Sequence, residues 1–149
     1  MDNDFQEKIH STFTSIASSL GYSEVHGRII SALLISGKEM SMDDIVKSTK
    51  YSAASISLSL DLLELVGIIK KFRRRGDRKL YVRLDGDLLE GLRNALLLKL
   101  HKEIAHTLNE FEDMKGDEKS KKSVRTIEKE VRRLQEYVTR LSKVPVPKR

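Results

Sequence analysis

The sequence predicts a mainly α-helical protein with one small β-hairpin and a long helical region in its C-terminal third. Apolar residues recur at helical spacing over most of the 149 residues. Serines that can cap helices open several of these segments, and glycines close them. Two short β-type runs flank Gly76-Asp77, a dipeptide suited to a tight hairpin. At this length the chain is expected to bury a core of its own.

Two helices are predicted before residue 38. The first carries its apolar residues on one stripe and ends at Gly21, the stripe being Phe5, Ile9, Phe13, Ile16, Ala17 and Leu20. The second follows Ser23 as its N-cap and ends at Gly37. Gly27 lies inside this second helix, where glycine costs about 1 kcal/mol relative to alanine. A close contact between helices would explain its presence.

Two shorter helices and the hairpin follow. Ser41 with Asp44 three residues later resembles a capping box and opens a third helix that fades around Tyr51. Ser52 caps a fourth helix, which runs to Val66 and is closed by Gly67. A helix, a tight turn, a capped helix, a glycine and a basic hairpin are the order of elements in a winged helix-turn-helix domain.

The hairpin is strongly basic. Residues 68–84 contain eight Lys or Arg and one Asp, a local charge of +7 in a chain whose net charge is +6. Such a concentration is typical of a surface that binds a polyanion. Arginines at its tip could enter a narrow minor groove. The alternative is a solvated basic hairpin without a nucleic-acid partner.

The fourth helix is the candidate recognition helix. Ile56, Leu60 and Leu63 form its predicted core face, and Ala54, Leu58 and Asp61 the opposite face. Residues 51–66 contain no Arg, Lys, Asn or Gln, the side chains that make most bidentate base contacts. We therefore expect affinity to depend on the hairpin, with modest or shape-based sequence reading. The alternative is a purely structural helix.

The C-terminal third is predicted to be helical and to dimerise. A long helix runs from Asp87 to about Lys115, and residues 116–122 form a polar break. Residues 124–141 then show alternating spacings of three and four between apolar positions, which is a short heptad seam. This seam needs the preceding helix or a second subunit to be stable. The basic outer face of this last helix is either solvated or an auxiliary phosphate contact.

No enzyme is predicted. The chain has no cysteine, no phosphate-binding glycine loop and no nucleophile motif. His106 and Glu110 share a helix face, but spacing supplies no third metal ligand, so neither a metal nor a cofactor is expected. No apolar run approaches 18 residues and the N-terminus is polar, which indicates a cytoplasmic protein without a membrane partner.

These segments together resemble the MarR superfamily, and within it the GbsR-type branch of archaea and bacteria. The resemblance covers about residues 5–90. It rests on Ser52 at the start of the recognition helix and on the core face of that helix, Ile56, Leu60 and Leu63. It also rests on Gly67-Ile68-Ile69, which leads into the basic hairpin or wing, and on Gly76-Asp77-Arg78-Lys79 near the tip of the wing. Leu84-Asp85 comes earlier than in the commoner MarR wing signature, which favours the GbsR-type branch. The resemblance implies a homodimer, formed by the N- and C-terminal helices, that places two winged domains on successive major grooves. A small-molecule effector is left open.

The sequence thus predicts a dimeric regulator of transcription, with a repressor favoured, that binds double-stranded DNA. The alternatives are an architectural DNA binder indifferent to sequence and a helical module that binds protein partners. The predicted parts are a dimerisation helix over 1–22, the winged helix-turn-helix domain over 23–86, a helical dimerisation region over 87–143 and a frayed tail over 144–149. The predicted DNA-binding residues are Tyr51, Ser52, Ala53, Ala54, Ser55, Ser57, Leu58, Lys70, Lys71, Arg73, Arg74, Arg75, Arg78, Lys79 and Arg83. The predicted dimerisation residues are Phe5, Ile9, Phe13, Ile104, Leu108, Phe111, Val124, Ile127, Val131, Leu134, Val138 and Leu141.

Overall fold

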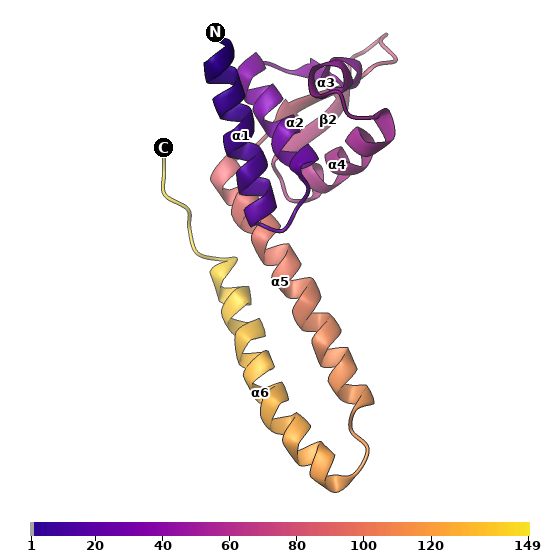
Figure 1. Cartoon of the computed structure of the whole chain (residues 1–149), viewed down its shortest axis with the longest axis vertical. Coiled ribbons are helices and arrows are strands. Elements are labelled where there is room, and N and C mark those ends of the chain that lie inside the picture. The colour runs from indigo at the N-terminus through magenta and orange to yellow at the C-terminus, as the bar shows by residue number, and fades with distance from the viewer. Residues whose placement is uncertain (1) are drawn as a thin grey trace. The chain divides into compact units, whose positions relative to one another are not determined.

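The computed structural model describes residues 2–149 and divides the chain into two compact units, Met1–Leu92 and Arg93–Arg149. The first unit contains, in chain order, α1 (Asn3–Ser19), α2 (Glu24–Ser36), β1 (Met40–Ser41), α3 (Met42–Thr49), α4 (Ala53–Leu65), β2 (Ile69–Arg73) and β3 (Leu80–Leu84) (Figure 1). Helix α5 (Leu88–Asp113) begins in this unit and continues into the second, which also holds α6 (Glu118–Leu141). The predicted fold class, mainly α with a small β-hairpin, is confirmed.

Helices α2, α3 and α4 begin after the serines that the sequence predicts as their N-caps. The hydroxyl of Ser41 accepts the backbone N–H of Asp44 at 3.1 Å, and that of Ser52 accepts the N–H of Ser55 at 3.1 Å. Each bond satisfies a backbone donor that the first helical turn leaves without a partner. Ser23 also stands at an N-cap, but its hydroxyl lies 3.0 Å from Nδ1 of His26 instead of capping the helix.

The sheet has three antiparallel strands in the order β1-β3-β2, so β3 is central. Phe72 pairs with Tyr81 across the hairpin, and Met40 pairs with Val82 on the other side of β3. The strand β1 was not predicted, because two residues are too few to show an alternating pattern. The prediction of a tight two-residue turn was wrong, since β2 ends at Arg73 and β3 begins at Leu80, which leaves a six-residue loop over 74–79.

The core of the first unit joins its helices to the sheet. The predicted core face of α4 is confirmed, with Ile56, Leu60 and Leu63 all buried. Ile45 of α3 and Val82 of β3 have no exposed surface and complete the contact. This packing fixes the direction in which the opposite face of α4 points.

Gly27 lies where α2 packs against α1. A Cβ atom added at this position would overlap the backbone of Phe13 and Thr14. The close contact expected from the sequence is therefore present, and only glycine fits it without moving α1.

The second unit is a helical hairpin. Leu97, Ile104 and Val138 form its buried cluster, with Leu108, Val131 and Leu141 packed against it. Asp117 caps α6 by accepting the N–H of Ser120 at 2.7 Å. The polar break predicted over 116–122 was therefore too long, because α6 already begins at Glu118. Within residues 2–149, no helix is both long and apolar enough to cross a membrane.

Candidate nucleic-acid interface

The outward face of α4 is exposed and almost uncharged. Leu58 is 73% exposed, and Ala54, Ser57 and Asp61 are exposed beside it. Of the other predicted contact residues on this segment, Ser52 and Ala53 are exposed, whereas Tyr51 and Ser55 are half-buried. This face can offer a hydroxyl and methyl groups to a groove.

The cations of the hairpin fall into two sets. Three of them form ion pairs within the first unit: Lys71 with Asp61 and, at 3.9 Å, with Glu64; Arg74 with Glu39; and Arg83 with Asp85 at 3.8 Å. The hydrogen bond from Lys71 to Asp61 raises the pKa of the lysine, and the one from Arg74 to Glu39 raises the pKa of the arginine. Both side chains are therefore held in their charged form.

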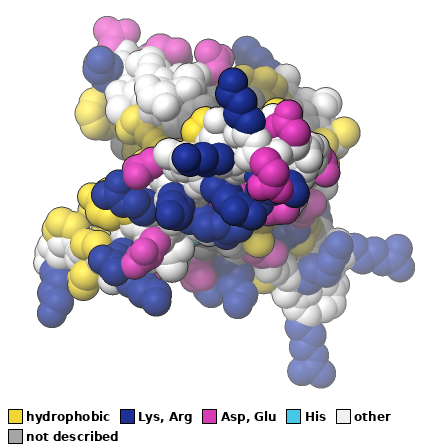
Figure 2. All heavy atoms as spheres, turned by 90° about the horizontal axis from the view of Figure 1, so that it is seen from below, with side chains coloured by type: hydrophobic (Ala, Val, Ile, Leu, Met, Phe, Trp, Pro, Cys, Tyr) yellow, Lys and Arg dark blue, Asp and Glu magenta, His cyan; other side chains and the backbone are white. Residues whose placement is uncertain are grey.

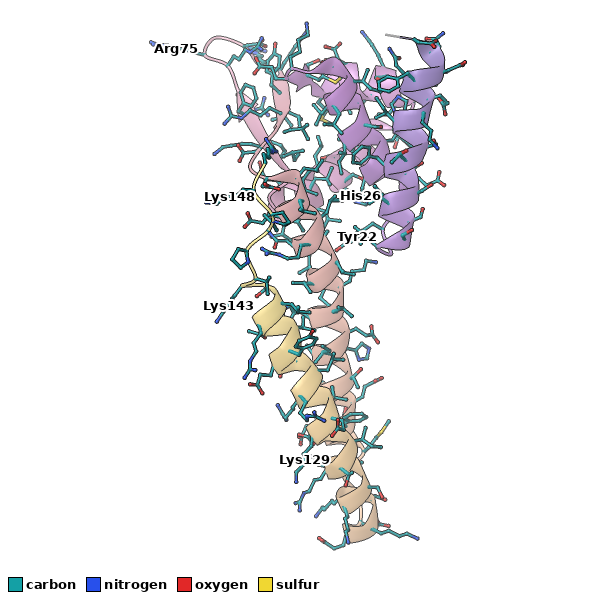
Figure 3. The ribbon with its side chains drawn as sticks, turned by 90° about the vertical axis from the view of Figure 1, so that its left-hand side faces the viewer. Tyr22, His26, Arg75, Lys129, Lys143 and Lys148 are labelled. Carbon is teal, nitrogen blue, oxygen red and sulfur yellow. The ribbon has the colours of Figure 1, made fainter. Side chains whose placement is uncertain are left out.

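The remaining five cations have no carboxylate within ion-pair distance among the residues that the structure describes. They are Lys70, Arg73, Arg75, Arg78 and Lys79, and all are exposed. Arg75 lies at the tip of the hairpin and points away from the protein (Figure 3). Arg73 instead donates to the backbone carbonyl of Arg78 at 2.5 Å, which joins the two ends of the loop. We call these five residues the free basic set of the wing, the wing being the hairpin of β2 and β3 with its loop. Counting charges in the sequence does not separate these five from the three paired cations.

Three members of the free basic set line one hollow beside α3. It has a volume of about 340 Å³ and is lined by Met42, Asp43, Arg73, Arg78, Lys79 and Leu80. Three cations face one acid there, so the local charge is positive. No sequence pattern indicates this hollow, because the start of α3 lies far from the wing along the chain.

The predicted dimerisation residues differ widely in exposure. Phe5 is 55% exposed, Ile127 53% and Leu134 46%. Ile9, Phe13, Leu108, Phe111, Val124, Val131 and Leu141 are half-buried. Ile104 and Val138 are buried inside the helical hairpin of a single chain, and their predicted contact with a second subunit stays a prediction. The heptad seam therefore has two sides, one packed within the chain and one outward.

The outer surface of α6 carries both paired and unpaired cations. The expected pairs are present, with Arg132 3.0 Å from Glu128 and Arg140 2.5 Å from Glu136. Lys122, Arg125 and Lys129 have no ion pair among residues 2–149. Figure 2, which views the molecule from below, shows Lys and Arg side chains gathered on the surface with Asp and Glu among them. Lys129 points outward in Figure 3.

His106 and Glu110, which share a helix face in the sequence, are close together in the structure. His106 Nδ1 lies 3.7 Å from Glu110 on an exposed surface, and no cluster of three His, Cys, Asp or Glu suited to a metal occurs within the described residues.

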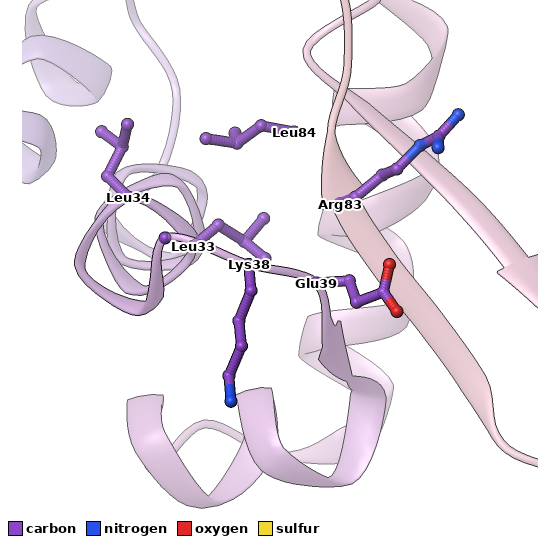
Figure 4. Close-up of a pocket in the computed structure, with 7 residues that line it drawn as sticks. Leu33, Leu34, Lys38, Glu39, Arg83 and Leu84 are labelled. Atoms are coloured by element: carbon purple, nitrogen blue, oxygen red, sulfur yellow. The ribbon is translucent and has the colours of Figure 1, made fainter.

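A second hollow, of about 300 Å³, has a floor of Leu33, Leu34 and Leu84 (Figure 4). The charged ends of Lys38 and Arg83 point away from this floor in Figure 4, so neither converges on it.

Three solved structures match this chain over most of its length. A crystal structure described as a transcriptional regulator superposes with a TM-score of 0.62 at 19% identity, covering 93% of this chain and 96% of the other. NadR in complex with 4-hydroxyphenylacetate gives a TM-score of 0.46 at 18% identity, covering 95% and 89%. A point mutant of S. aureus MepR bound to an oligodeoxyribonucleotide gives 0.47 at 14% identity, covering 92% of each chain.

The other comparisons give no match. No protein-family model matches the sequence, and no curated protein matches it significantly. The likeness to the first structure establishes the fold, which is that of a winged-helix protein with a helical C-terminal region.

Proposed function

We propose that this protein is a dimeric DNA-binding regulator of transcription, and that it is a repressor of the MarR type with a GbsR-like wing. In this proposal α4 enters the major groove, and the wing contacts adjacent phosphates or the minor groove. One observation carries the proposal: the same compact unit holds an exposed α4 face whose one acid, Asp61, is paired with Lys71, and five cations that form no ion pair within the described chain. A solved transcriptional regulator with the same fold supports it.

The two parts of the proposed interface have different tasks. Phosphate contacts supply affinity and register, whereas base edges supply sequence information. The free basic set can supply the first. The face of α4 offers Ser57 and Leu58 for contacts with a base edge or a thymine methyl, so sequence preference is expected to be modest.

The test is the salt dependence of binding to a DNA duplex. The logarithm of affinity falls with the logarithm of salt concentration, with a slope of about 0.9 for each phosphate that is neutralised. Replacing Arg75, Arg78 and Lys79 together by alanine is expected to lower the slope by up to roughly 2.7. The matched control replaces Lys122, Arg125 and Lys129 of α6, which removes the same charge outside the wing.

The two triple variants separate the proposed surfaces. A reduced slope for the wing variant with an unchanged slope in the control supports the wing as the DNA contact. A slope that the wing variant leaves unchanged would overturn this assignment. A reduced slope in the control assigns the auxiliary phosphate contact to α6.

The second candidate function is an architectural DNA binder indifferent to sequence. It is favoured by one observation, the lack of base-reading side chains over residues 51–66. Footprinting on the DNA around the gene distinguishes the two functions. A discrete protected site supports regulation, and uniform protection supports the architectural function.

The remaining proposals concern assembly and location. We propose that the exposed apolar residues of the N- and C-terminal helices are covered by a second copy of the chain, and that the dimer acts in the cytoplasm. An effector would be a small molecule whose chemistry the present surfaces leave open.

A further inference from the structure

The Asp77 carboxylate makes two of the hydrogen bonds that hold the six-residue loop at the wing tip. The backbone N–H of Asp77 donates to the carbonyl of Arg74 at 3.0 Å, which forms a turn at Gly76. Asp77 Oδ1 accepts the backbone N–H of Lys79 at 2.9 Å, and Oδ2 accepts the hydroxyl of Tyr81 at 2.7 Å. Both carboxylate oxygens therefore bond inside the hairpin.

A second set of contacts ties this loop to the body of the first unit. The guanidinium of Arg74 lies 3.9 Å from the centroid of the Tyr81 ring and forms an ion pair with Glu39. Glu39 precedes β1 and is 35 residues distant from Arg74 in the sequence. The Tyr81 ring also stacks on that of Phe72 with centroids 5.8 Å apart. The tip is thus braced from a segment outside the hairpin.

The single acid in this loop is used as a hydrogen-bond acceptor and forms no ion pair with the cations that the structure describes around it. Asp77 is the one negative side chain over residues 68–84. Bonds from the Lys79 backbone N–H and the Tyr81 hydroxyl hold its pKa below the usual value, so it stays a hydrogen-bond acceptor at neutral pH. Its neighbours Arg75, Arg78 and Lys79 keep their charges free of ion pairs within the described chain.

We propose that Glu39, Arg74, Asp77 and Tyr81 are positioning residues that fix the wing-tip loop before DNA arrives. Arg75, Arg78 and Lys79 then meet the phosphates already arranged, and binding does not have to order the loop. This inference rests on the proposed function. Ordering a loop during binding reduces affinity, and an arrangement fixed in advance avoids that loss.

The first part of the test examines the free protein. Tyr81→Phe keeps the ring and its stacking and removes only the hydroxyl that reaches Asp77. A net loss of one hydrogen bond predicts amide hydrogen exchange that is roughly 2- to 12-fold faster at Lys79, with exchange in the paired strands unchanged. Tyr137→Phe makes the same chemical change on the exposed surface of α6 and is the matched control.

The second part measures binding to a DNA duplex against salt. Tyr81→Phe is expected to weaken binding by roughly 2- to 12-fold while the salt slope stays that of the wild type, because no phosphate contact is removed. Glu39→Gln, outside the hairpin, is also expected to weaken DNA binding. It tests the ion pair between Arg74 and Glu39 even if Tyr81→Phe fails to fold. Loss of affinity with an unchanged slope, together with faster exchange at Lys79 in the free protein, distinguishes positioning from direct contact.

Several outcomes overturn the inference. If the loop amides of both Tyr81→Phe and Glu39→Gln exchange hydrogen at the wild-type rate, the network does not fix the tip. Faster exchange with wild-type affinity would show that a fixed tip is irrelevant to binding. A wild-type protein that binds no duplex even at low salt overturns the proposed function as well, whereas normal wild-type binding with a fully active Tyr81→Phe variant overturns the positioning role alone.

Discussion

Lys71 on β2 forms an ion pair with Asp61 on the outward face of α4. Asp61 is the acidic residue of the face that is proposed to enter the groove, and an unpaired carboxylate there would repel the phosphates. The pairing neutralises it and connects the recognition helix to the wing. We therefore infer that Lys71 assists the proposed DNA binding through Asp61 and not through a phosphate contact of its own.

We therefore expect Lys71→Ala to weaken DNA binding through the exposed charge of Asp61. Exposed ion pairs contribute about 0.2–1 kcal/mol, so the loss is expected to be up to roughly fivefold. The double variant Lys71→Ala/Asp61→Asn is expected to recover most of that affinity, because it removes the carboxylate as well. Binding titrations of both variants provide the measurement. A double variant as weak as Lys71→Ala would instead mean that Lys71 contacts a phosphate directly.

Gly27→Ala is expected to destabilise the first unit. The added methyl group would overlap the backbone of Phe13, and relieving such overpacking costs about 1–3 kcal/mol. Urea denaturation followed by circular dichroism measures the change. Gly116→Ala is the control, because a Cβ at that position has nothing within 4 Å, and its stability is expected to stay close to that of the wild type. Equal stability of the Gly27 variant would contradict the close packing of α1 on α2.

The stability of the first unit is expected to fall between about pH 7.5 and 5.5 because of His10. His10 Nδ1 lies 2.5 Å from Ser31 Oγ, and burial, with a contribution from Arg28, lowers the pKa of the imidazole below 6.5, while Glu7 opposes the shift. The unfolded chain then binds more protons than the folded chain, so stability decreases as the pH falls through 6.5. Urea midpoints at the two pH values measure this.

A pair of variants isolates the histidine. His10→Gln is expected to show a smaller difference between the two pH values, whereas His106→Gln, on the exposed surface of α5, is expected to keep the wild-type difference. An undiminished pH dependence in the His10 variant would assign the effect to other groups.

The outward side of the α6 seam is expected to hold the dimer. Ile127→Glu with Leu134→Glu places two charges on this exposed apolar surface and is expected to shift the protein to a 17.0 kDa monomer in sedimentation at micromolar concentration. Thr126→Glu with Thr139→Glu adds the same charge at exposed positions beside the seam and is expected to leave the dimer intact. A wild-type species of 17.0 kDa would remove the dimer from the proposal.

Local signals in the sequence were sufficient for the helices. Ser41 and Ser52 cap their helices through the expected hydroxyl bonds, and the core face of α4 follows from the helical spacing of Ile56, Leu60 and Leu63. These features depend on neighbours within a few residues. The same local reasoning missed β1, whose two residues pair only because β3 lies beside them.

The candidate site was predictable in outline and not in its electrostatics. The sequence shows eight cations in the hairpin but not which are neutralised, because Glu39 and Asp61 reach Arg74 and Lys71 only in the folded chain. The role of Asp77 in the loop was also missed, since the turn was expected to be two residues long. Its Asp-x-Lys-x-Tyr spacing was the signal available, because a carboxylate can accept the backbone N–H two residues later.

The order of the sheet leaves β2 at an open edge, with β1 covering the other side of the central strand. A free edge is a template on which another chain can add a strand and start aggregation. Here the backbone N–H of Lys71 donates to the Glu64 carboxylate at 2.8 Å, and the strand is short and carries Lys70 and Lys71. Short length, edge lysines and an occupied backbone N–H all disfavour the addition of a further strand, so we expect the basic side chains of β2 to protect this edge as well as to serve the proposed DNA contact.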